Sequence, residues 1–291
     1  TTIAASAVFP DPHFPLAFRR HDRHAPTQLH RHDFHELVVI LAGKGRHLTE
    51  RGDYPLTAGD VFLIRGEMAH GYADTDAMTL INIFFDPRRL RLPTHALADV
   101  PGYQALFRVE PHLRHKRPLP PHLHLPPDDL ARAAAIIAEL SAELDEQKPG
   151  YRFAALAALM RLLVFLSRRY FRSPRAERPT LKPISELLSY IEAHFAGRIT
   201  LRDLRQRAGM SHATLNRAFH AVMGCSPVEH IIRVRLSRAA ELLRQPGVRI
   251  TEAAFACGFP MPTISPASSA GEWDFIPRLA AARSIPQPTP A

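Results

Sequence analysis

The chain has few of the residues that mark secreted or membrane-spanning proteins. Its 291 residues include only two cysteines, Cys225 and Cys257, which excludes a disulfide framework and leaves no CxxC pair. No apolar run approaches the ~20 residues of a membrane-spanning helix, and the N-terminus lacks the basic start and apolar stretch of a signal peptide. These absences favour a globular protein of the cytoplasm that has no contact with a membrane.

Acidic residues are also scarce relative to basic ones. The sequence has 37 Lys and Arg against 28 Asp and Glu, a formal net charge of +9. Residues 175–254 hold 13 basic and 7 acidic residues, so 13 − 7 = +6 of that charge lies in this stretch. Such asymmetry favours a polyanionic partner for the C-terminal half, although a merely solvated basic surface would give the same count.

The pattern of apolar residues changes along the chain and predicts an α+β protein with two domains. Short apolar runs separated by turn signals favour a small antiparallel β-barrel or sandwich. Two periodic segments follow it, and these helices would either pack on the barrel or pair between subunits. The expected parts are an N-terminal arm at 1–29, the barrel domain at 30–127 with a loop-like end from 86 and a basic patch at 114–117, a helical segment at 128–172, a linker at 173–182, an all-α domain at 183–259 and a tail at 260–291.

The all-α domain contains a pattern typical of a helix-turn-helix. Thr200 and Asp203 form a predicted helix cap, and Gly209 allows the positive φ of a tight turn. In the next helix Leu215 and Phe219 would face inward, so the opposite face is free to reach base edges in a DNA major groove. The candidate DNA-binding residues are His212, Ala213, Asn216, Arg217 and His220. In isolation, an ordinary helical hairpin with a solvated face would show the same pattern.

The same pattern recurs 49 residues later, so that Gly258 corresponds to Gly209. A long helix with Ser226 as its cap and Pro227 at its first position joins the two units, and would set two recognition helices about one DNA turn (~34 Å) apart. With the string ITEAAFACGF at 250–259, residues 184–259 resemble the DNA-binding domain of AraC/XylS-type transcription regulators. The resemblance implies an all-α domain with two helix-turn-helix units.

The barrel domain has motifs of its own. The string HRHDFHE at 30–36 and the segment 59–70 resemble the two motifs of cupin domains. Three imidazoles and one carboxylate from these motifs make a set that can hold a divalent metal ion with open positions. The alternative is a polar pocket without metal, and departures from the usual cupin residues at Arg65, Glu67 and Asp74 weaken the case for an enzyme. The candidate metal ligands are His30, His32, Glu36 and His70.

The order of barrel, two helices, linker and paired helix-turn-helix is similar to that of sugar-responsive AraC-type activators. The string HDFHEL at 32–37 with HGY at 70–72 looks most like the L-rhamnose-responsive members. This resemblance implies a regulator, most often an activator, that binds a small sugar, promoter DNA and RNA polymerase as a homodimer and needs no cofactor. The candidate ligand-binding residues are His30, His32, Glu36, His70, Tyr72 and Asn82.

Two other readings remain open. The first is a metal-dependent cupin enzyme with an appended helical domain, although the sequence has no nucleophile motif, phosphate loop or nucleotide fingerprint. The second is a sensor with impaired DNA binding, and it follows from the tail. After Phe259 the family continues with a string like DxxYFxRxFRR, whereas this chain has Pro262 and Pro266, which disfavour a helix.

The tail also permits a specific explanation. Synonymous codons exist for residues 261–271 that, with one preceding G, spell DANYFTRVFRR in a shifted frame. We therefore expect the chain from about Met261 to be an out-of-frame product, which would leave the second helix-turn-helix truncated.

Overall fold

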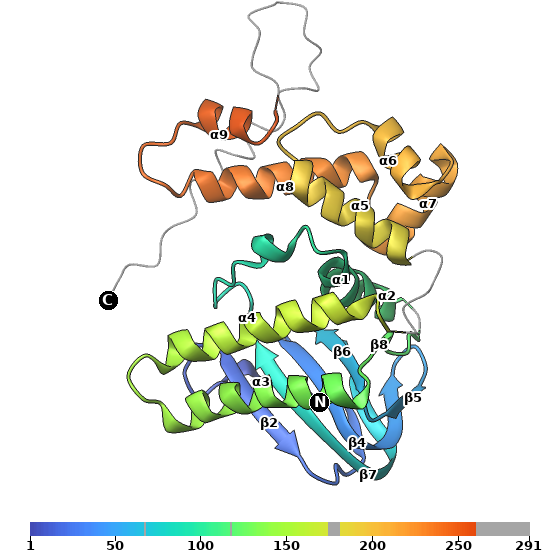
Figure 1. Ribbon diagram of the computed structural model, residues 1–291, viewed down its shortest axis with the longest axis vertical. Coiled ribbons are helices and arrows are strands. Elements are labelled where there is room, and N and C mark those ends of the chain that lie inside the picture. The colour runs from blue at the N-terminus through green and yellow to red at the C-terminus, as the bar shows by residue number, and fades with distance from the viewer. Residues whose placement is uncertain (67, 117, 174–180, 260–291) are drawn as a thin grey trace, which may run out of the picture. The chain divides into compact units, whose positions relative to one another are not determined.

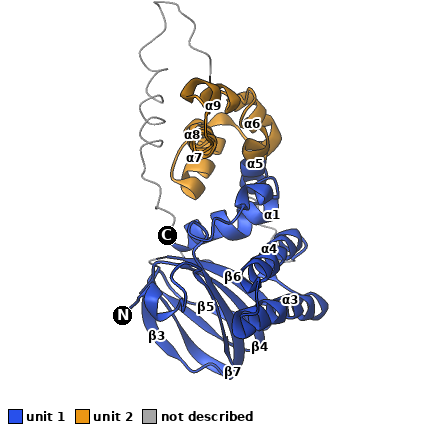
Figure 2. Ribbon diagram, turned by 90° about the vertical axis from the view of Figure 1, so that its left-hand side faces the viewer, with its two compact units in different colours: residues 1–189 blue, residues 190–291 orange. Residues whose placement is uncertain are grey.

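The computed structural model describes residues 1–66, 68–116, 118–173 and 181–259 (Figure 1). The chain divides into two compact units, residues 1–189 and 190–291 (Figure 2). A β-sheet with helices makes up the first unit, and the described part of the second is helical. This confirms the expected α+β architecture. Most of the expected linker at 173–182 and all of the tail at 260–291 lie outside the described residues.

Two long strands organise the sheet of unit 1. The described strands are β1 (Thr2–Ile3), β2 (Leu16–His21), β3 (Thr27–His32), β4 (His35–Thr49), β5 (Tyr54–Thr57), β6 (Asp60–Arg65), β7 (His70–Phe85) and β8 (Leu123–His124). Their order in the sheet is β1-β3-β7-β4-β6-β8, while β2 also pairs with β7 and β5 with β4, so the long strands β4 and β7 lie at its centre. The register of β4 against β7 shifts at Gly43, whose φ of +71° and close approach to Ala77 suit only glycine.

Alternate residues of the sheet face two separate apolar layers, which is why the central strands read as continuous apolar runs. The inner layer contains Val38, Ile40, Tyr54, Leu56, Phe62, Ile64, Met68, Tyr72, Met78 and Leu80. The outer layer contains residues such as Leu37, Val39, Leu63 and Ile83. Burial of each such side chain contributes ~1.5–3 kcal/mol.

The outer layer is covered by two helices, α3 (Pro127–Glu146) and α4 (Tyr151–Tyr170), which lie against the sheet (Figure 1). Ile137, Leu140 and Leu163 belong to the same core as the outer residues of the sheet. The apolar stripes of both helices are thus buried against the sheet within one chain, whereas pairing between subunits stays a prediction.

The N-terminal part of the chain differs from the expected arm. Leu16–His21 forms β2, which pairs with Phe85–Leu80 of β7. Its charged end, Arg19 and Arg20, resembles a solvated segment because only the first residues of this strand are buried. Residues 1–29 are therefore not a free arm.

The segment from 86 to 127 is also more ordered than expected. It contains η2 (Thr94–Leu97), α1 (Pro101–Tyr103), the π-helical turn η3 (Gln104–Val109) and α2 (Glu110–Arg114). The expected basic patch at 114–117 is wrong for Arg114, which is only 1% exposed. Its guanidinium donates to Glu110 at 2.5 Å and to the main-chain oxygen of Leu63 at 3.2 Å, so its charge is neutralised inside the unit.

Glu110 is the centre of this buried network. Its Oε2 accepts the hydrogen bond from Arg114, while its Oε1 accepts from Nδ1 of His122 at 2.6 Å and from the hydroxyl of Tyr170 at 2.5 Å. The four residues are each at most 2% exposed. One carboxylate thus connects α2, the chain before β8 and the end of α4.

Five helices follow in the described chain after residue 180. They are α5 (Leu181–His194), α6 (Leu201–Ala208), α7 (His212–Met223), α8 (Pro227–Leu242) and α9 (Ile250–Ala256). The predicted caps are confirmed: Thr200 and Asp203 cap α6 reciprocally, and Ser226 accepts from the Glu229 N–H of α8. Cys225 and Cys257 are buried and not bonded to each other. None of the helices in the described ranges combines the length and apolarity of a membrane span.

The Glu110 network predicts a pH-dependent contribution to stability. Burial alone would raise the pKa of Glu110, but the charge of Arg114 and the hydrogen bonds from His122 and Tyr170 hold that pKa below its usual value. The network therefore stabilises the fold at neutral pH, and this contribution is lost as the pH falls from ~4.5 through the lowered pKa. We expect Glu110→Gln to lower the free energy of unfolding by ~3–5 kcal/mol at pH 7 and by less at pH 3.

Urea titrations followed by circular dichroism at the two pH values measure this difference. Glu139→Gln is the matched control, because the exposed pair of Glu139 with Arg161 is worth less than ~1 kcal/mol. Equal stability of Glu110→Gln and the parent chain at pH 7 would show that the network contributes nothing.

Candidate functional site

Polar side chains from three strands meet inside the barrel. Glu36 lies on the same face of β4 as Val38, and Val38 pairs with Asn82 on β7. His32 ends β3 and His70 begins β7. Of the six candidate ligand-binding residues, five are buried and His30 is half-buried. The sheet thus brings together residues that are up to 52 positions apart (82 − 30 = 52).

Glu36 is the charged group of this cluster. Its Oε2 lies 2.9 Å from Nε2 of His32 and 3.4 Å from Nε2 of His70. Burial alone would raise the pKa of Glu36, but the two histidines outweigh burial and lower that pKa, so the carboxylate is ionised at neutral pH. Among the described residues His32, Glu36 and His70 form a group whose ligand atoms lie within 4.8 Å of one another. His30 lies beside this group, with its ring 4.3 Å from that of His70.

Three residues of the cluster were not predicted from the sequence: His24, His47 and Tyr54. The ring of His47 is fully buried and lies 5.0 Å from the ring of Tyr54 and 5.3 Å from that of Tyr72. The sequence contains a signal for this contact, because a hairpin across the turn at 51–53 pairs His47 with Tyr54.

Several polar atoms of the cluster are buried without a hydrogen-bond partner in the described part of the chain. They are both ring nitrogens of His47, the hydroxyl of Tyr72, Oδ1 of Asn82 and Nδ1 of His24. Burial, and then the proximity of His70 and Arg114, keep the pKa of His47 well below its usual value, and burial raises the pKa of Tyr72. The site therefore offers neutral donors and acceptors. Because buried polar groups are normally satisfied, this concentration indicates a place for a bound molecule.

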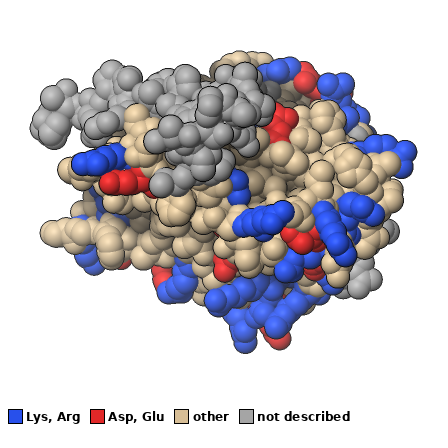
Figure 3. All heavy atoms as spheres, turned by 90° about the horizontal axis from the view of Figure 1, so that it is seen from above, with Lys and Arg blue, Asp and Glu red and all other residues tan. Residues whose placement is uncertain are grey.

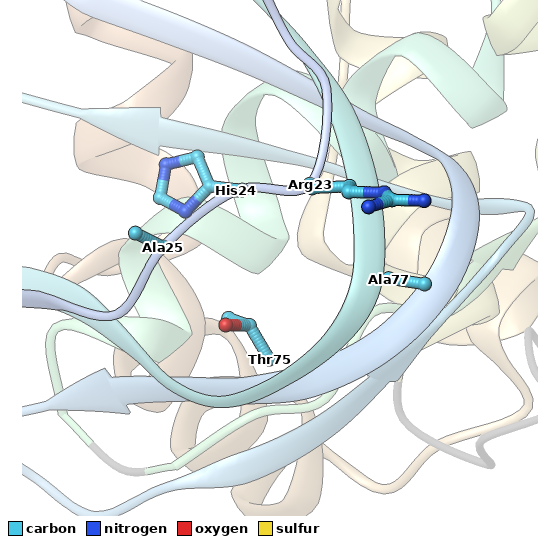
Figure 4. A pocket seen from close by; sticks show the side chains of 5 residues that line it. All are labelled: Arg23, His24, Ala25, Thr75 and Ala77. Atoms are coloured by element: carbon cyan, nitrogen blue, oxygen red, sulfur yellow. The ribbon is translucent and has the colours of Figure 1, made fainter.

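A pocket of about 320 Å³ opens beside this cluster (Figure 4). Arg23, His24 and Ala25 line it from the turn between β2 and β3, and Thr75 and Ala77 line it from β7. The ring of His24 also lies 4.9 Å from that of Tyr72. His24 thus belongs both to the pocket and to the polar cluster.

The candidate DNA-binding residues lie on α7 as expected. Gly209 ends α6 with a φ of +63°, and Leu215 and Phe219 are fully buried. On the other side of α7, Asn216 is half-buried and the remaining candidates, His212, Ala213, Arg217 and His220, are exposed. The exposed arginines of α6 and α7 are Arg202, Arg205, Arg207 and Arg217. On the face drawn in Figure 3, the blue Lys and Arg cover more of the surface than the red Asp and Glu.

The expected repeat of this unit is present as far as Phe259. After α9, Gly258 has a φ of +82°, and a side chain there would come within 2.6 Å of the Ala196 carbonyl oxygen. The recognition helix of the second unit would fall on residues outside the described chain. The expectation of an out-of-frame tail from about Met261 therefore stays a prediction, and reading the 3′ end of the gene tests it.

Comparisons with known proteins match both domains of the chain. A family model described as an AraC-like ligand binding domain matches residues 15–163, and one described as a helix-turn-helix domain matches residues 204–263. The HTH-type transcriptional activators RhaR of Salmonella dublin and of Salmonella typhimurium are each 30% identical over 231 residues, which cover 78% of this chain and 77% of the relative.

Solved structures give a weaker likeness. ToxT from Vibrio cholerae O395 covers 92% of each chain with 12% identity and a TM-score of 0.34. The family therefore rests on the sequence matches. Since those relatives are named transcriptional activators, the enzyme reading is set aside, and the chain belongs to the AraC family as a transcriptional activator with an N-terminal ligand-binding domain and a C-terminal helix-turn-helix domain.

Proposed function

We propose that the barrel binds a small uncharged sugar and that this effector controls binding of the helix-turn-helix domain to promoter DNA. The main support for this proposal is that buried polar atoms of His47, Tyr72 and Asn82 have no hydrogen-bond partner among the described residues. Sugar hydroxyls both donate and accept hydrogen bonds, so they satisfy a mixture of such groups.

The chemistry of the site favours a neutral ligand over a charged one. Burial holds His47 and Tyr72 in their uncharged forms. The apolar side chains of the inner layer, such as Val38 and Met78, suit the C–H groups of a sugar ring and a methyl group. A 6-deoxyhexose has both, and the likeness of the motif strings to rhamnose-responsive regulators makes L-rhamnose the first candidate.

The proposed effector site predicts that Tyr72→Phe weakens binding of the effector without lowering the stability of the ligand-free chain. The change removes a hydroxyl without a partner among the described residues, so the melting temperature without ligand should stay the same or rise. Binding of L-rhamnose should weaken by ~0.5–1.5 kcal/mol. Thermal denaturation of the full chain measures both quantities, since a ligand at 100 times its dissociation constant stabilises the parent by ~2.7 kcal/mol.

Tyr151→Phe is the matched control for this experiment. The Tyr151 hydroxyl lies outside the barrel on α4, where it accepts from Arg152, so the ligand-induced shift should remain complete. A complete shift in both Tyr72→Phe and His47→Phe would exclude the interior cluster as the effector site. A panel of pentoses and other 6-deoxyhexoses identifies the sugar.

We further propose that α7 reads base edges through Asn216 and Arg217, since Arg217 lies opposite the buried Leu215 and Phe219 and the half-buried Asn216 lies at the border of that face. Arginine pairs with guanine and asparagine with adenine in the major groove. Replacing either residue with alanine should cost ~1–3 kcal/mol on a specific site and little on random DNA.

Gel-shift titrations measure these losses with a site that the parent chain has selected from random DNA. Arg132→Ala is the control, because Arg132 is an exposed arginine of α3 in the other unit. Equal losses on specific and random DNA would assign Asn216 and Arg217 to phosphate contacts instead.

The remaining parts of the proposal concern assembly. The family resemblance supports a homodimer that acts with RNA polymerase in the cytoplasm. Phe153 of α4 is 80% exposed in the single chain and offers apolar surface to a second copy.

A further inference from the structure

The histidines around Glu36 share one hydrogen-bonding arrangement. Nδ1 of His32 lies 2.9 Å from the carbonyl oxygen of Phe34, and Nδ1 of His70 lies 3.1 Å from that of Met68. A carbonyl oxygen only accepts hydrogen bonds, so each Nδ1 carries a proton and donates. In the neutral ring the other nitrogen, Nε2, then has a lone pair and no proton. Both rings are therefore fixed as the tautomer that presents an acceptor.

These two acceptor nitrogens lie close to a third acceptor, a carboxylate oxygen. Nε2 of His32 is 2.9 Å and Nε2 of His70 is 3.4 Å from the same oxygen, Oε2 of Glu36. All three side chains are at most 3% exposed, so water does not screen them. Lone pairs and a negative charge at such distances repel in a low-dielectric interior unless a cation lies between them.

One proton placed among these three groups still leaves one of them without a hydrogen-bond partner. If His32 takes a proton on Nε2, it donates to Glu36, but Nε2 of His70 remains without a hydrogen-bond partner in the described ranges. A metal ion accepts all three ligand atoms at once. With metal–ligand bonds of ~2.1 Å, neighbouring ligand atoms lie ~3.0 Å apart in an octahedron and ~3.4 Å apart in a tetrahedron. The observed distances of 2.9 and 3.4 Å fit those spacings.

We propose that His32, Glu36 and His70 bind one divalent first-row transition metal ion. Two imidazoles and one carboxylate favour zinc, iron(II), nickel or manganese over magnesium and calcium, which prefer oxygen ligands throughout. The hydrogen bonds from Nδ1 to the carbonyl oxygens of Phe34 and Met68 are the outer contacts that orient histidine ligands in metal sites. His30 is not included, since it does not belong to the group of ligand atoms that lie within 4.8 Å of one another and it is only half-buried.

Three protein ligands leave positions open for other oxygen atoms. Adjacent hydroxyl groups of a sugar can fill such positions, so a bound ion would raise the affinity for the effector. This coupling rests on the proposed function, whereas binding of the metal does not.

Cobalt(II) titration of the full chain after treatment with a chelator tests the metal site. We expect one equivalent to bind with visible d–d absorption bands, and Zn²⁺ to displace it in calorimetric competition. Glu36→Gln and His70→Asn should each weaken Co²⁺ binding at least tenfold, in line with the loss of an interaction that supports a metal site. His95→Asn, a change at an exposed histidine of η2, should leave it unchanged.

Melting temperatures of the metal-free variants show whether each one folds, and the parent titration does not depend on any variant. Absence of the bands in the parent chain would overturn the proposal, and so would binding that survives in folded Glu36→Gln and His70→Asn. In the overturned case an imidazolium–carboxylate pair occupies the site.

The same samples separate the metal from the effector. A melting shift with L-rhamnose that is lost on chelation and restored by Zn²⁺ supports the coupling. A shift that persists in the metal-free chain overturns the coupling and supports the sugar site alone. No shift with any sugar of the panel in either form contradicts the proposed function, while the cobalt titration still decides the metal site.

Discussion

Removing the carboxylate of Glu110 from water costs free energy that its partners must offset, and those partners come from separate parts of unit 1. Arg114 lies on α2, His122 precedes β8, and Tyr170 ends α4. Because each of them must be in place at once, this single charge determines where the three segments meet. The guanidinium of Arg114 also lies 5.4 Å from the ring of Phe62, a member of the inner layer. The barrel interior and the last turn of α4 are therefore held by one set of contacts.

How much of the structure can be predicted from the sequence depends on how far apart in the sequence the interacting residues lie. The caps of α6 and α8 involve residues three positions apart, so Thr200 and Ser226 predict the helix starts correctly. The charge of Arg114 predicts a surface patch wrongly, since its burial depends on Glu110 being held in turn by Tyr170, which is 60 residues away from it. A run of basic residues does not by itself reveal such distant partners.

The same distinction applies to the interior site. His32, Glu36 and His70 were found because their spacing resembles a known motif, and the structure brings them together. His47 was missed because it follows the irregular register of β4 between Ile40 and Arg46, where simple alternation no longer tells which face a residue occupies. β2 was missed for another reason, since its charged end resembles a solvated segment while its pairing with β7 is set by the rest of the sheet.

Among its described residues, unit 1 buries two glutamates beside histidines, Glu36 and Glu110, and they differ in whether their hydrogen bonds are complete. Glu110 has Arg114, a side chain that stays charged at every relevant pH, and further donors fill both of its oxygens. Such a network is complete without any other molecule. Glu36 faces only two imidazoles whose nearest nitrogens are acceptors in the neutral ring, and the polar atoms around it lack partners in the described chain. Natural proteins seldom leave buried polar groups unsatisfied. Glu36 and its two histidines therefore need a partner that the folded chain does not supply. This need is typical of a binding site and not of a core.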